Sequence, residues 1–250
     1  MRISATLLAT ALLVATALFA TNTLADLKDY DIMTETYPPY NFKKSGQLQG
    51  IGVEILLAAS EKGNLGVSRS DIRLLPWARG YENVQNQQQS MLFSTTRTEA
   101  REDLFKWAGP ITETRIALIA KKGSDLSFNS ASDYAYPTIA VVRDDVAESL
   151  VRDKGATDGN LDISARPEPA MRKLAAGRVD AWAYEENVAY WLLNSEGHNT
   201  DGFEVVDVLS ESELYYAFHP DTPDQVVDSL QKAIDALSQK ERKAILDEYL

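Results

Sequence analysis

The sequence predicts an α/β protein made of two lobes of similar construction. Between residues 26 and 123, short apolar segments typical of strands alternate with amphipathic segments typical of helices. The same alternation starts again near residue 136 and continues toward the C-terminus. Such alternation is typical of a mainly parallel sheet covered by helices. Neither a sequence repeat nor a low-complexity segment interrupts the pattern.

Hydrophobic spacing and helix-ending residues predict the elements of the first half. Residues 29–36 form a strand-like run, and the two prolines Pro38 and Pro39 then mark a rigid turn between aromatic side chains. Residues 50–63 have helical spacing and stop at Gly63. The remaining predicted elements are strands at 71–77, 90–96 and 115–123 and a polar helix at 80–89.

The second half repeats this order of elements. A strand at 136–143 leads into a helix at 144–155, which carries acids in its first turn and a glycine at its end. The remaining predicted elements are helices at 168–179, 186–197, 221–239 and 240–250 and strands at 180–185, 203–210 and 213–219.

The N-terminus has the parts of a secretory signal peptide. Arg2 precedes an apolar run at 5–20, and small residues end the segment at Ala25. The run is shorter than the ~20 apolar residues of a membrane span. We therefore expect residues 1–25 to be removed. The chain has no cysteine, which excludes disulfides, thiolate metal sites and acylation at a cysteine. We expect a protein of the bacterial periplasm that is not a lipoprotein.

Charge and motif content narrow the classes of function. The formal net charge is −12, which disfavours nucleic acid as a partner because phosphate binding needs clustered Lys and Arg. No phosphate loop, dinucleotide fingerprint, nucleophile elbow or zinc-binding helix motif is present. The two histidines, His198 and His219, are far apart in the sequence and are expected at the surface. We expect no metal, no cofactor and a monomer.

Arg101 is the first candidate binding residue, in the stretch "TEAREDLFKWAGP" at 98–110. One interpretation is a surface arginine that pairs with Glu102 or Glu99. Such a pair contributes only ~0–1 kcal/mol. The other interpretation is a fixed positive charge for a ligand carboxylate, which the planar guanidinium can bind through two parallel hydrogen bonds.

Four motifs in order resemble those of the periplasmic solute-binding proteins of family 3, the polar amino-acid receptors of ABC transporters. They are "YPPYNF" followed by "GIGVEIL", then "TEAREDLFKWAGP", then "AAGRVDAWAYEENVA", and finally "AILDEYL". The resemblance covers nearly all of residues 26–250. It implies a type II periplasmic binding protein fold, with mixed sheets flanked by helices and two hinge crossings. The ligand would then lie between the lobes, beyond the carboxyl ends of the strands.

The resemblance also implies the boundaries of the two lobes. The hinge would comprise 111–116 and 208–214. Lobe 1 would comprise 26–110 and 215–250, and lobe 2 would comprise 117–207.

The resemblance assigns roles to five side chains. Arg101 would bind the α-carboxylate of the ligand, and Glu185, where the family usually has Asp, would bind the α-amino group. Tyr37 and Trp77 would enclose the ligand side chain, with lobe 1 core as the alternative. Thr96 would contribute a hydroxyl or backbone group, with a helix cap as its alternative. For Glu185 the alternative is a helix N-terminal acid, and Glu186 could share either role.

One departure from the family pattern concerns the lobe 2 wall of the site. Where the family commonly has Gly-Thr, this chain has Asp144 and Asp145. Acids at a helix N-terminus act as caps, which is the alternative to ligand binding by Asp145. In either case they would make this wall negative and disfavour a second anionic group on the ligand.

The resemblance therefore implies a binding protein and not an enzyme. It would capture a small zwitterionic solute, an amino acid or a related compound, for an inner-membrane ABC permease. One alternative is a cyclohexadienyl or arogenate dehydratase on the same fold, with Glu185 as general acid. Another is a sensory ligand-binding protein that docks on a receptor.

Overall fold

The computed structural model describes residues 26–250, and the predicted signal peptide at 1–25 lies outside the described residues. The strands are β1 (Asp31–Thr34), β2 (Phe42–Lys44), β3 (Gln47–Gln49), β4 (Ile72–Leu74), β5 (Ser90–Thr96), β6 (Lys106–Lys121), β7 (Ile139–Val142), β8 (Leu161–Ser164), β9 (Ala181–Glu185) and β10 (Phe203–Phe218). The α-helices are α1 (Ile51–Gly63), α2 (Trp77–Asn86), α3 (Val146–Asp153), α4 (Pro167–Ala175), α5 (Glu186–Ser195), α6 (Asp224–Asp235) and α7 (Gln239–Tyr249).

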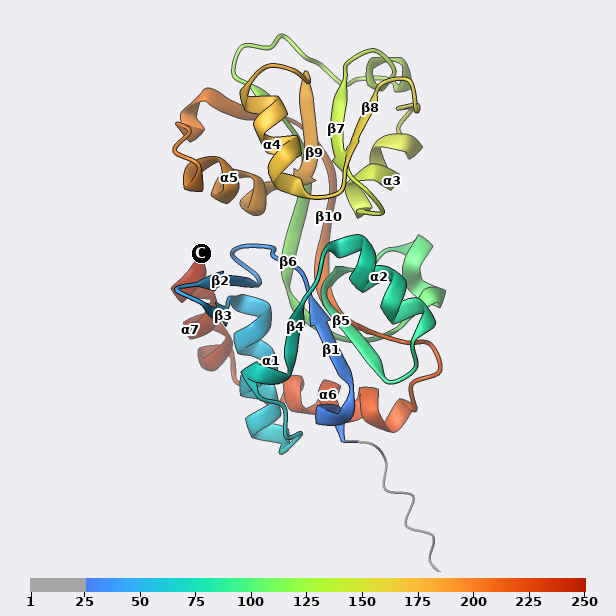
Figure 1. Cartoon of the computed structure of the whole chain (residues 1–250), viewed down its shortest axis with the longest axis vertical. Helices are drawn as coiled ribbons and strands as arrows, with labels where there is room; N and C mark the ends of the chain where they lie inside the picture. Colours follow the sequence, from blue (N-terminus) through green and yellow to red (C-terminus); the bar gives the residue numbers. More distant parts are fainter. Residues whose placement is uncertain (1–25) are drawn as a thin grey trace, which may run out of the picture.

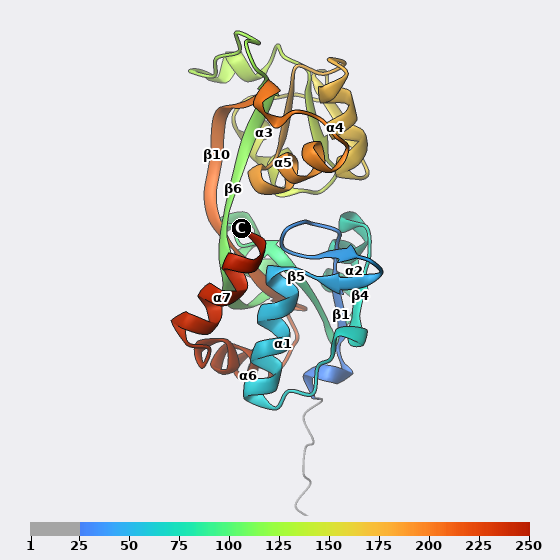
Figure 2. The same ribbon diagram turned by 90° about the vertical axis from the view of Figure 1, so that its left-hand side faces the viewer.

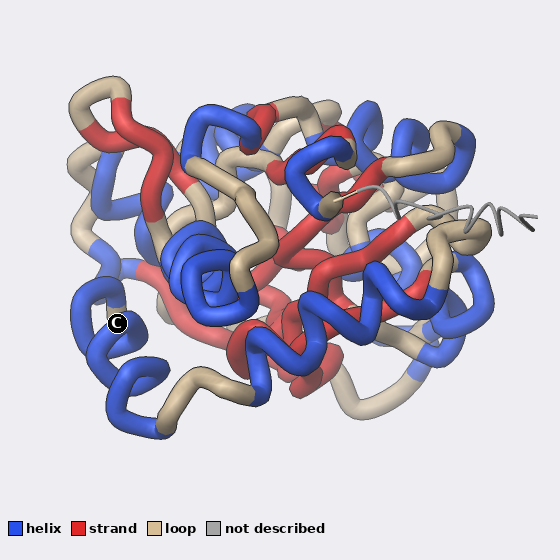
Figure 3. Tube along the Cα trace, turned by 90° about the horizontal axis from the view of Figure 1, so that it is seen from below, coloured by secondary structure: helices blue, strands red, loops and turns tan. Residues whose placement is uncertain are grey.

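Two α/β lobes lie one above the other, joined by the long strands β6 and β10 (Figure 1). Lobe 1 contains β1–β5, α1, α2, α6 and α7, and lobe 2 contains β7–β9 and α3–α5 (Figures 1 and 2). Seen from below, strands pass through the interior and helices lie around them (Figure 3). This is the two-lobed arrangement of helices and mixed sheet that the sequence predicts.

One mixed sheet runs through both lobes in the order β4-β1-β5-β10-β6-β9-β7-β8. The outer pairs are parallel, as βαβ connections require, whereas β10 pairs antiparallel with β5 and β6, and β6 with β9. The β6–β10 ladder runs from Phe203 opposite Lys121 to Phe218 opposite Lys106. The two crossing segments therefore support each other along their whole length.

The predicted hinge segments, 111–116 and 208–214, lie within β6 and β10. Irregular register between Val208 and Ser210 and between Leu214 and Tyr216 falls at the two ends of the second segment. The residue bounds of the hinge and of the lobes stay predictions.

A glycine-dependent contact places the "YPPYNF" turn on the start of α1. Gly50 has a φ of +122°, and a Cβ there would lie 2.5 Å from the carbonyl oxygen of Tyr40. The first turn of α1 uses this proximity, because the amide of Gly52 donates to the Tyr40 carbonyl (2.8 Å) and that of Ile51 to the Pro39 carbonyl (3.2 Å). The unsatisfied amides of the helix start are thereby bonded. The turn carries Tyr37 and Tyr40 to the edge of lobe 1 that faces lobe 2.

The largest hydrophobic core continues from lobe 1 into lobe 2. It includes Ile55 and Phe93 in lobe 1 and Met171 and Leu193 in lobe 2, and tyrosines of both lobes meet between them. A second core lies under α3 in lobe 2, and a third lies between α2 and the lobe 1 sheet. The lobes are therefore packed against each other, in a closed arrangement.

Several element predictions were wrong in detail. The strand predicted at 71–77 ends at Leu74, and Trp77 already begins α2 after Pro76. The strands predicted at 203–210 and 213–219 are one strand, β10, because the polar residues between them belong to the crossing and need no apolar pattern. The short strands β2, β3 and β8 were not predicted. His219, expected at the surface, is buried.

Candidate functional site

Arg101 is buried at the boundary between the lobes. It lies in a 3₁₀ helix at Glu99–Leu104, directly after β5, and is only 7% exposed. Its guanidinium lies 5.4 Å from the ring centroid of Trp77 and 5.0 Å from that of Tyr81, both on α2. These distances allow cation–π attraction. The guanidinium donates to the carbonyl oxygens of Thr96 (3.3 Å) and Asp144 (3.1 Å).

The structure does not contain the surface ion pair considered for Arg101. Glu102 pairs with Arg97 at 2.5 Å, and both of these side chains are partly exposed. Among residues 26–250, Arg101 takes part in no ion pair, since its hydrogen-bond acceptors are neutral carbonyls. Arg101 is thus a buried cation that faces lobe 2 without a carboxylate in contact.

Asp144 joins the lobes through its backbone. Its φ of +60° is unusual for a residue with a side chain and turns its carbonyl toward lobe 1. That carbonyl accepts from Arg101 and also from the indole Nε1 of Trp77 (2.9 Å). The next residue, Asp145, caps α3 by accepting from the amide of Ala147 (2.9 Å). Burial raises the pKa of Asp145, although its helix-capping bond and Arg101 oppose this.

Glu185 lies where β9 ends and α5 begins, and it is fully buried. One carboxylate oxygen caps α5 by accepting from the amide of Val188 (2.8 Å). The other accepts from the hydroxyl of Tyr40 in lobe 1 (2.8 Å). Burial raises the pKa of Glu185 to about 7, against the lowering effect of these two hydrogen bonds. Its neighbour Glu186 instead pairs with Arg115 at 2.5 Å, so the two acids have different surroundings.

Three tyrosines make a second set of contacts between the lobes. The ring of Tyr37 packs against Tyr40 (5.5 Å between centroids) and meets Tyr184 of β9 edge-on (5.7 Å). Tyr184 stacks on Trp182 at 5.0 Å. Both Tyr184 and Trp182 are fully buried, and neither the Tyr184 hydroxyl nor the Trp182 indole nitrogen has a hydrogen-bond partner among the described residues. Buried polar atoms of this kind are rare without a partner.

An acidic group lies beside these tyrosines. We define it as Glu35, directly after β1, Asp145, before α3, and Glu168, in the first turn of α4. Burial and the charges of Asp145 and Glu168 raise the pKa of Glu35 well above its ordinary value, and Arg101 lowers it. The pKa of Tyr184 is raised by burial and by all three acids together with Glu185. The Tyr184 hydroxyl therefore lies near four acidic side chains.

A cavity of about 250 Å³ opens beside this acidic group, between the lobes. We call it the inter-lobe cavity. Lobe 1 lines it from the ends of β1 and β4 to the start of α2, and lobe 2 lines it with the turn from β8 into α4. The lining residues are Glu35, Thr36, Leu74, Leu75, Pro76, Trp77, Ala165, Arg166, Pro167 and Glu168. They lie where strands end, which is where ligands of open α/β sheets bind.

The family model of the bacterial extracellular solute-binding proteins, family 3, matches residues 32–250. The chain belongs to this family. The match includes both lobes and both crossing strands, and it confirms the family resemblance of the four motifs.

Solved structures of amino-acid-binding proteins share the fold at low sequence identity. The arginine-, lysine-, histidine-binding protein ArtJ from Geobacillus stearothermophilus is 17% identical, with a TM-score of 0.74 over 88% of this chain and 94% of that one. A substrate-binding protein of an ABC uptake transporter from Streptococcus pneumoniae, with bound histidine, is 15% identical, with a TM-score of 0.75 over 88% and 91%.

A histidine kinase sensor domain with similarity to periplasmic binding proteins also matches, at 19% identity, with a TM-score of 0.77 over 88% of this chain and 96% of that one. No curated protein sequence matches the chain. At identities this low, the structural similarity establishes the two-lobed fold alone. The family and these neighbours are binding or sensor proteins.

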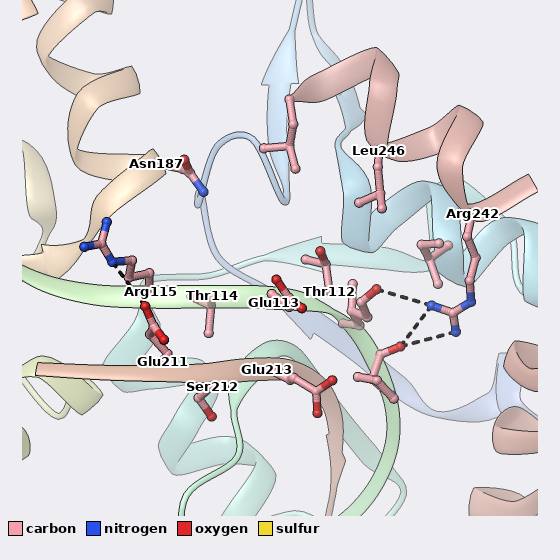
Figure 4. Close-up of a pocket in the computed structure, with 14 residues that line it drawn as sticks. Thr112, Glu113, Thr114, Arg115, Asn187, Glu211, Ser212, Glu213, Arg242 and Leu246 are labelled. Carbon is pink, nitrogen blue, oxygen red and sulfur yellow. Dashed lines mark hydrogen bonds and ion pairs between the residues drawn. The ribbon is translucent and has the colours of Figure 1, made fainter. Parts of the chain in front are cut away.

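A larger cavity, of about 1050 Å³, lies beside the crossing strands β6 and β10 (Figure 4). The crossing strands form its floor, and α7 and the start of α5 flank it. Arg242 donates there to the carbonyls of Pro110 and Ile111, and Asn187 points toward the space from lobe 2 (Figure 4). None of the six predicted site residues lines this cavity. Its wide groove lacks the buried charges that hold a small ligand.

The structure brings the predicted residues to one boundary between the lobes. Arg101, Trp77, Thr96 and Tyr37 approach it from lobe 1, and Glu185 and Asp145 approach it from lobe 2. Thr96 contributes its carbonyl as an acceptor for Arg101. Their roles toward a ligand stay predictions.

The sequence reasoning missed Glu35, Tyr40, Tyr184 and Glu168 at this boundary. A usable indication existed for two of them, because Glu35 directly follows a strand and Tyr40 lies within the quoted "YPPYNF" motif.

Among residues 26–250, no helix is long and apolar enough to cross a bilayer. In the same range, no cluster of acidic or histidine side chains is arranged to hold a metal ion.

Proposed function

We propose that this protein captures a small solute with a carboxylate and an amino group, most simply an amino acid, between its lobes. The observation that carries this proposal is the burial of Arg101 without an ionic partner among the described residues. A buried charge with no counter-charge in contact is costly, whereas a guanidinium with a carboxylate gains two aligned hydrogen bonds. A ligand carboxylate at Arg101 would complete this part of the site.

Glu185 supplies the opposite charge from lobe 2. Its carboxylate is buried, keeps one oxygen on the α5 cap and directs the other toward lobe 1. An ammonium group beside it would favour the ionised form and would lower its raised pKa. Arg101 and Glu185 together would bind the two charges of a zwitterion from opposite lobes, so that only the closed arrangement binds both.

We further propose that the loaded protein delivers its solute to an inner-membrane ABC permease from the periplasm. Family membership supports this proposal, and so does the structural similarity to the substrate-binding protein of an ABC uptake transporter. The hinge at 111–116 and 208–214 would let lobe 1 and lobe 2 separate to release the solute. Because strands β6 and β10 pair along their whole length, we expect a bending motion that keeps this ladder intact.

Titration calorimetry of the refolded, ligand-free protein against the standard amino acids tests the substrate class. We expect saturable binding of at least one amino acid with one site per chain. An absence of heat with every amino acid and simple amine would reject the amino-acid class, although not the fold.

The sensor-domain neighbour favours a second candidate function, ligand sensing. A sensory protein would use the same site but would present its closed lobes to a receptor. The genes beside the coding sequence separate the two functions. Adjacent permease and ATPase genes support uptake, whereas an adjacent receptor or kinase gene supports sensing.

A further inference from the structure

We propose that the solute carries a second positively charged group at the end of its side chain, and that Glu35 and Glu168 bind this group in the inter-lobe cavity. This inference rests on the proposed function, since it takes Arg101 and Glu185 as the site of the α-carboxylate and α-amino groups. It adds the chemical class of the side chain.

The first argument is the imbalance of charge around the inter-lobe cavity. Glu35 and Glu168 both line it, and the charge of Asp145 acts on Glu35. On the positive side, Arg101 is assigned to the ligand carboxylate, and Arg166, which also lines the cavity, is exposed to solvent. A cationic group on the ligand would therefore favour the ionised forms of these acids and lower the raised pKa of Glu35, whereas an anionic group would raise that pKa further.

The second argument is that the two carboxylates in the cavity wall have free acceptor capacity. Glu35 is 7% exposed, and within residues 26–250 its side chain makes neither a hydrogen bond nor an ion pair; only its backbone carbonyl is used, by Asn41 (2.6 Å). One oxygen of Glu168 is buried and has no partner among the described residues. Buried carboxylates without donors are costly, and a guanidinium or ammonium group supplies several donors.

The third argument is the position of the cavity relative to Arg101. Trp77 belongs to both places, because its ring lies beside the Arg101 guanidinium and also lines the inter-lobe cavity. A ligand whose carboxylate meets Arg101 can therefore extend along Trp77 toward Glu35. The volume of about 250 Å³ lies just below the ~300 Å³ lower limit of small-molecule sites, which suits a single side chain.

Three matched compounds test the inference. Arginine has both charged ends, citrulline has the same shape without the side-chain charge, and agmatine has the guanidinium without the carboxylate. We expect the full-length protein in calorimetry to bind arginine at least tenfold more tightly than citrulline. Lysine and norleucine form a second charged and neutral pair of different reach. At least one of the two pairs should show this preference for the charged member.

The variants Glu35→Gln and Glu168→Gln locate the preference. Each should weaken binding of the charged compound about tenfold or more and leave its neutral partner within a factor of three. Glu82→Gln, which removes an exposed acid of α2, is the matched control and should change neither. Melting temperatures close to that of the wild type would show that the variants are folded.

The outcomes separate this inference from the proposed function. Equal binding of charged and neutral members in both pairs, or heat with neutral amino acids alone, would overturn the inference and leave the function standing. Agmatine binding as tightly as arginine would contradict the role of Arg101 but would support the cation site. No heat with any amino acid or amine would overturn both.

Discussion

Arg101 and the acids around it share one physical condition, which is removal from water. The guanidinium is stabilised by two carbonyls and two aromatic faces, and Glu35, Asp145 and Glu185 all have pKa values raised by burial. In such surroundings electrostatic interactions are stronger than in water, so a ligand that supplies the missing counter-charges gains affinity from each of them.

Substitution of Arg101 measures the largest of these interactions. Arg101→Ala should weaken amino-acid binding by ~30-fold to several thousand-fold, because loss of one partner of a buried charge pair costs ~2–5 kcal/mol. Arg101→Lys should also lose much of the affinity, since an ammonium cannot reproduce the planar fork. The measurement is calorimetric affinity of each variant, with the melting temperature followed alongside.

Arg97→Ala is the matched control for Arg101. This arginine lies four residues earlier, pairs with Glu102 and is partly exposed. Its removal should change affinity by no more than a factor of a few, as expected of a surface ion pair. If Arg101→Ala also changed affinity by no more than a factor of a few, Arg101 would not bind the ligand carboxylate. The site would then have to be assigned again, starting from its aromatic residues.

The sequence allowed some site residues to be predicted and not others. Arg101 and Glu185 belong to local motifs that this chain carries in the order and at the spacing typical of the family. Glu168 and Tyr184 become relevant only because closure of the lobes brings α4 and β9 against the ends of β1 and β4. The spacing of residues along the chain does not indicate this contact between the two lobes. The exchange of Gly-Thr for Asp144 and Asp145 was visible in the sequence, but the inter-lobe role of the Asp144 carbonyl was not.

Among the elements, those with long, well-buried apolar runs were predicted best. The helix α1 and the strand β5 have clear apolar patterns and were found close to their bounds. The strand β10 was divided in two because Glu211 and Ser212 are polar: Glu211 is exposed, and Ser212 is partly buried and donates to the carbonyl of Arg97 (3.1 Å). The hairpin of β2 and β3 is too short to show a period. Prediction therefore failed where a strand is short or carries no continuous apolar pattern.

The junction of β9 and α5 should give the site a pH response through Glu185. Burial raises its pKa to about 7 from an ordinary 4.5, so the ionised form that binds an ammonium group is complete only above about 7. Affinity should fall by up to tenfold per pH unit below that value. Glu185→Gln retains the shape of the cap, should weaken binding ~10- to 150-fold and should flatten this profile.

Calorimetry between pH 5.5 and 7.5 checks this response, with Glu82→Gln as the control because Glu82 is an exposed acid of α2. The pH dependence of the stability of the free protein has the opposite sign to that of the affinity. A raised carboxyl pKa stabilises the free protein below about 4.5, and this stabilisation is lost as the pH rises through about 7. A wild-type profile as flat as that of Glu185→Gln would assign the ammonium group to a different acid.

At the scale of the whole molecule, function depends on the balance between open and closed lobes. The closed arrangement is held by hydrogen bonds from Tyr40 to Glu185 and from Trp77 and Arg101 to Asp144, together with the contact of Tyr37 and Tyr184. These contacts lie around the proposed ligand. Their strength therefore sets what fraction of the free protein is ready to bind, and the measured affinity scales with that fraction.

Tyr40→Phe tests this coupling with the loss of one oxygen atom. The hydroxyl of Tyr40 links lobe 1 to Glu185 at 2.8 Å, and a hydrogen bond to a carboxylate contributes ~1.5–3 kcal/mol. The variant should need ~10- to 150-fold more solute for saturation, yet at saturation its radius of gyration in small-angle X-ray scattering should equal that of the wild type. Tyr216→Phe is the control, because the Tyr216 hydroxyl donates to Gly52 inside lobe 1 (2.9 Å) and its loss should lower stability without changing affinity. Unchanged affinity in Tyr40→Phe would mean that the hydrogen bond across the lobes is not coupled to binding, and closure would then depend on the ligand and the Asp144 carbonyl alone.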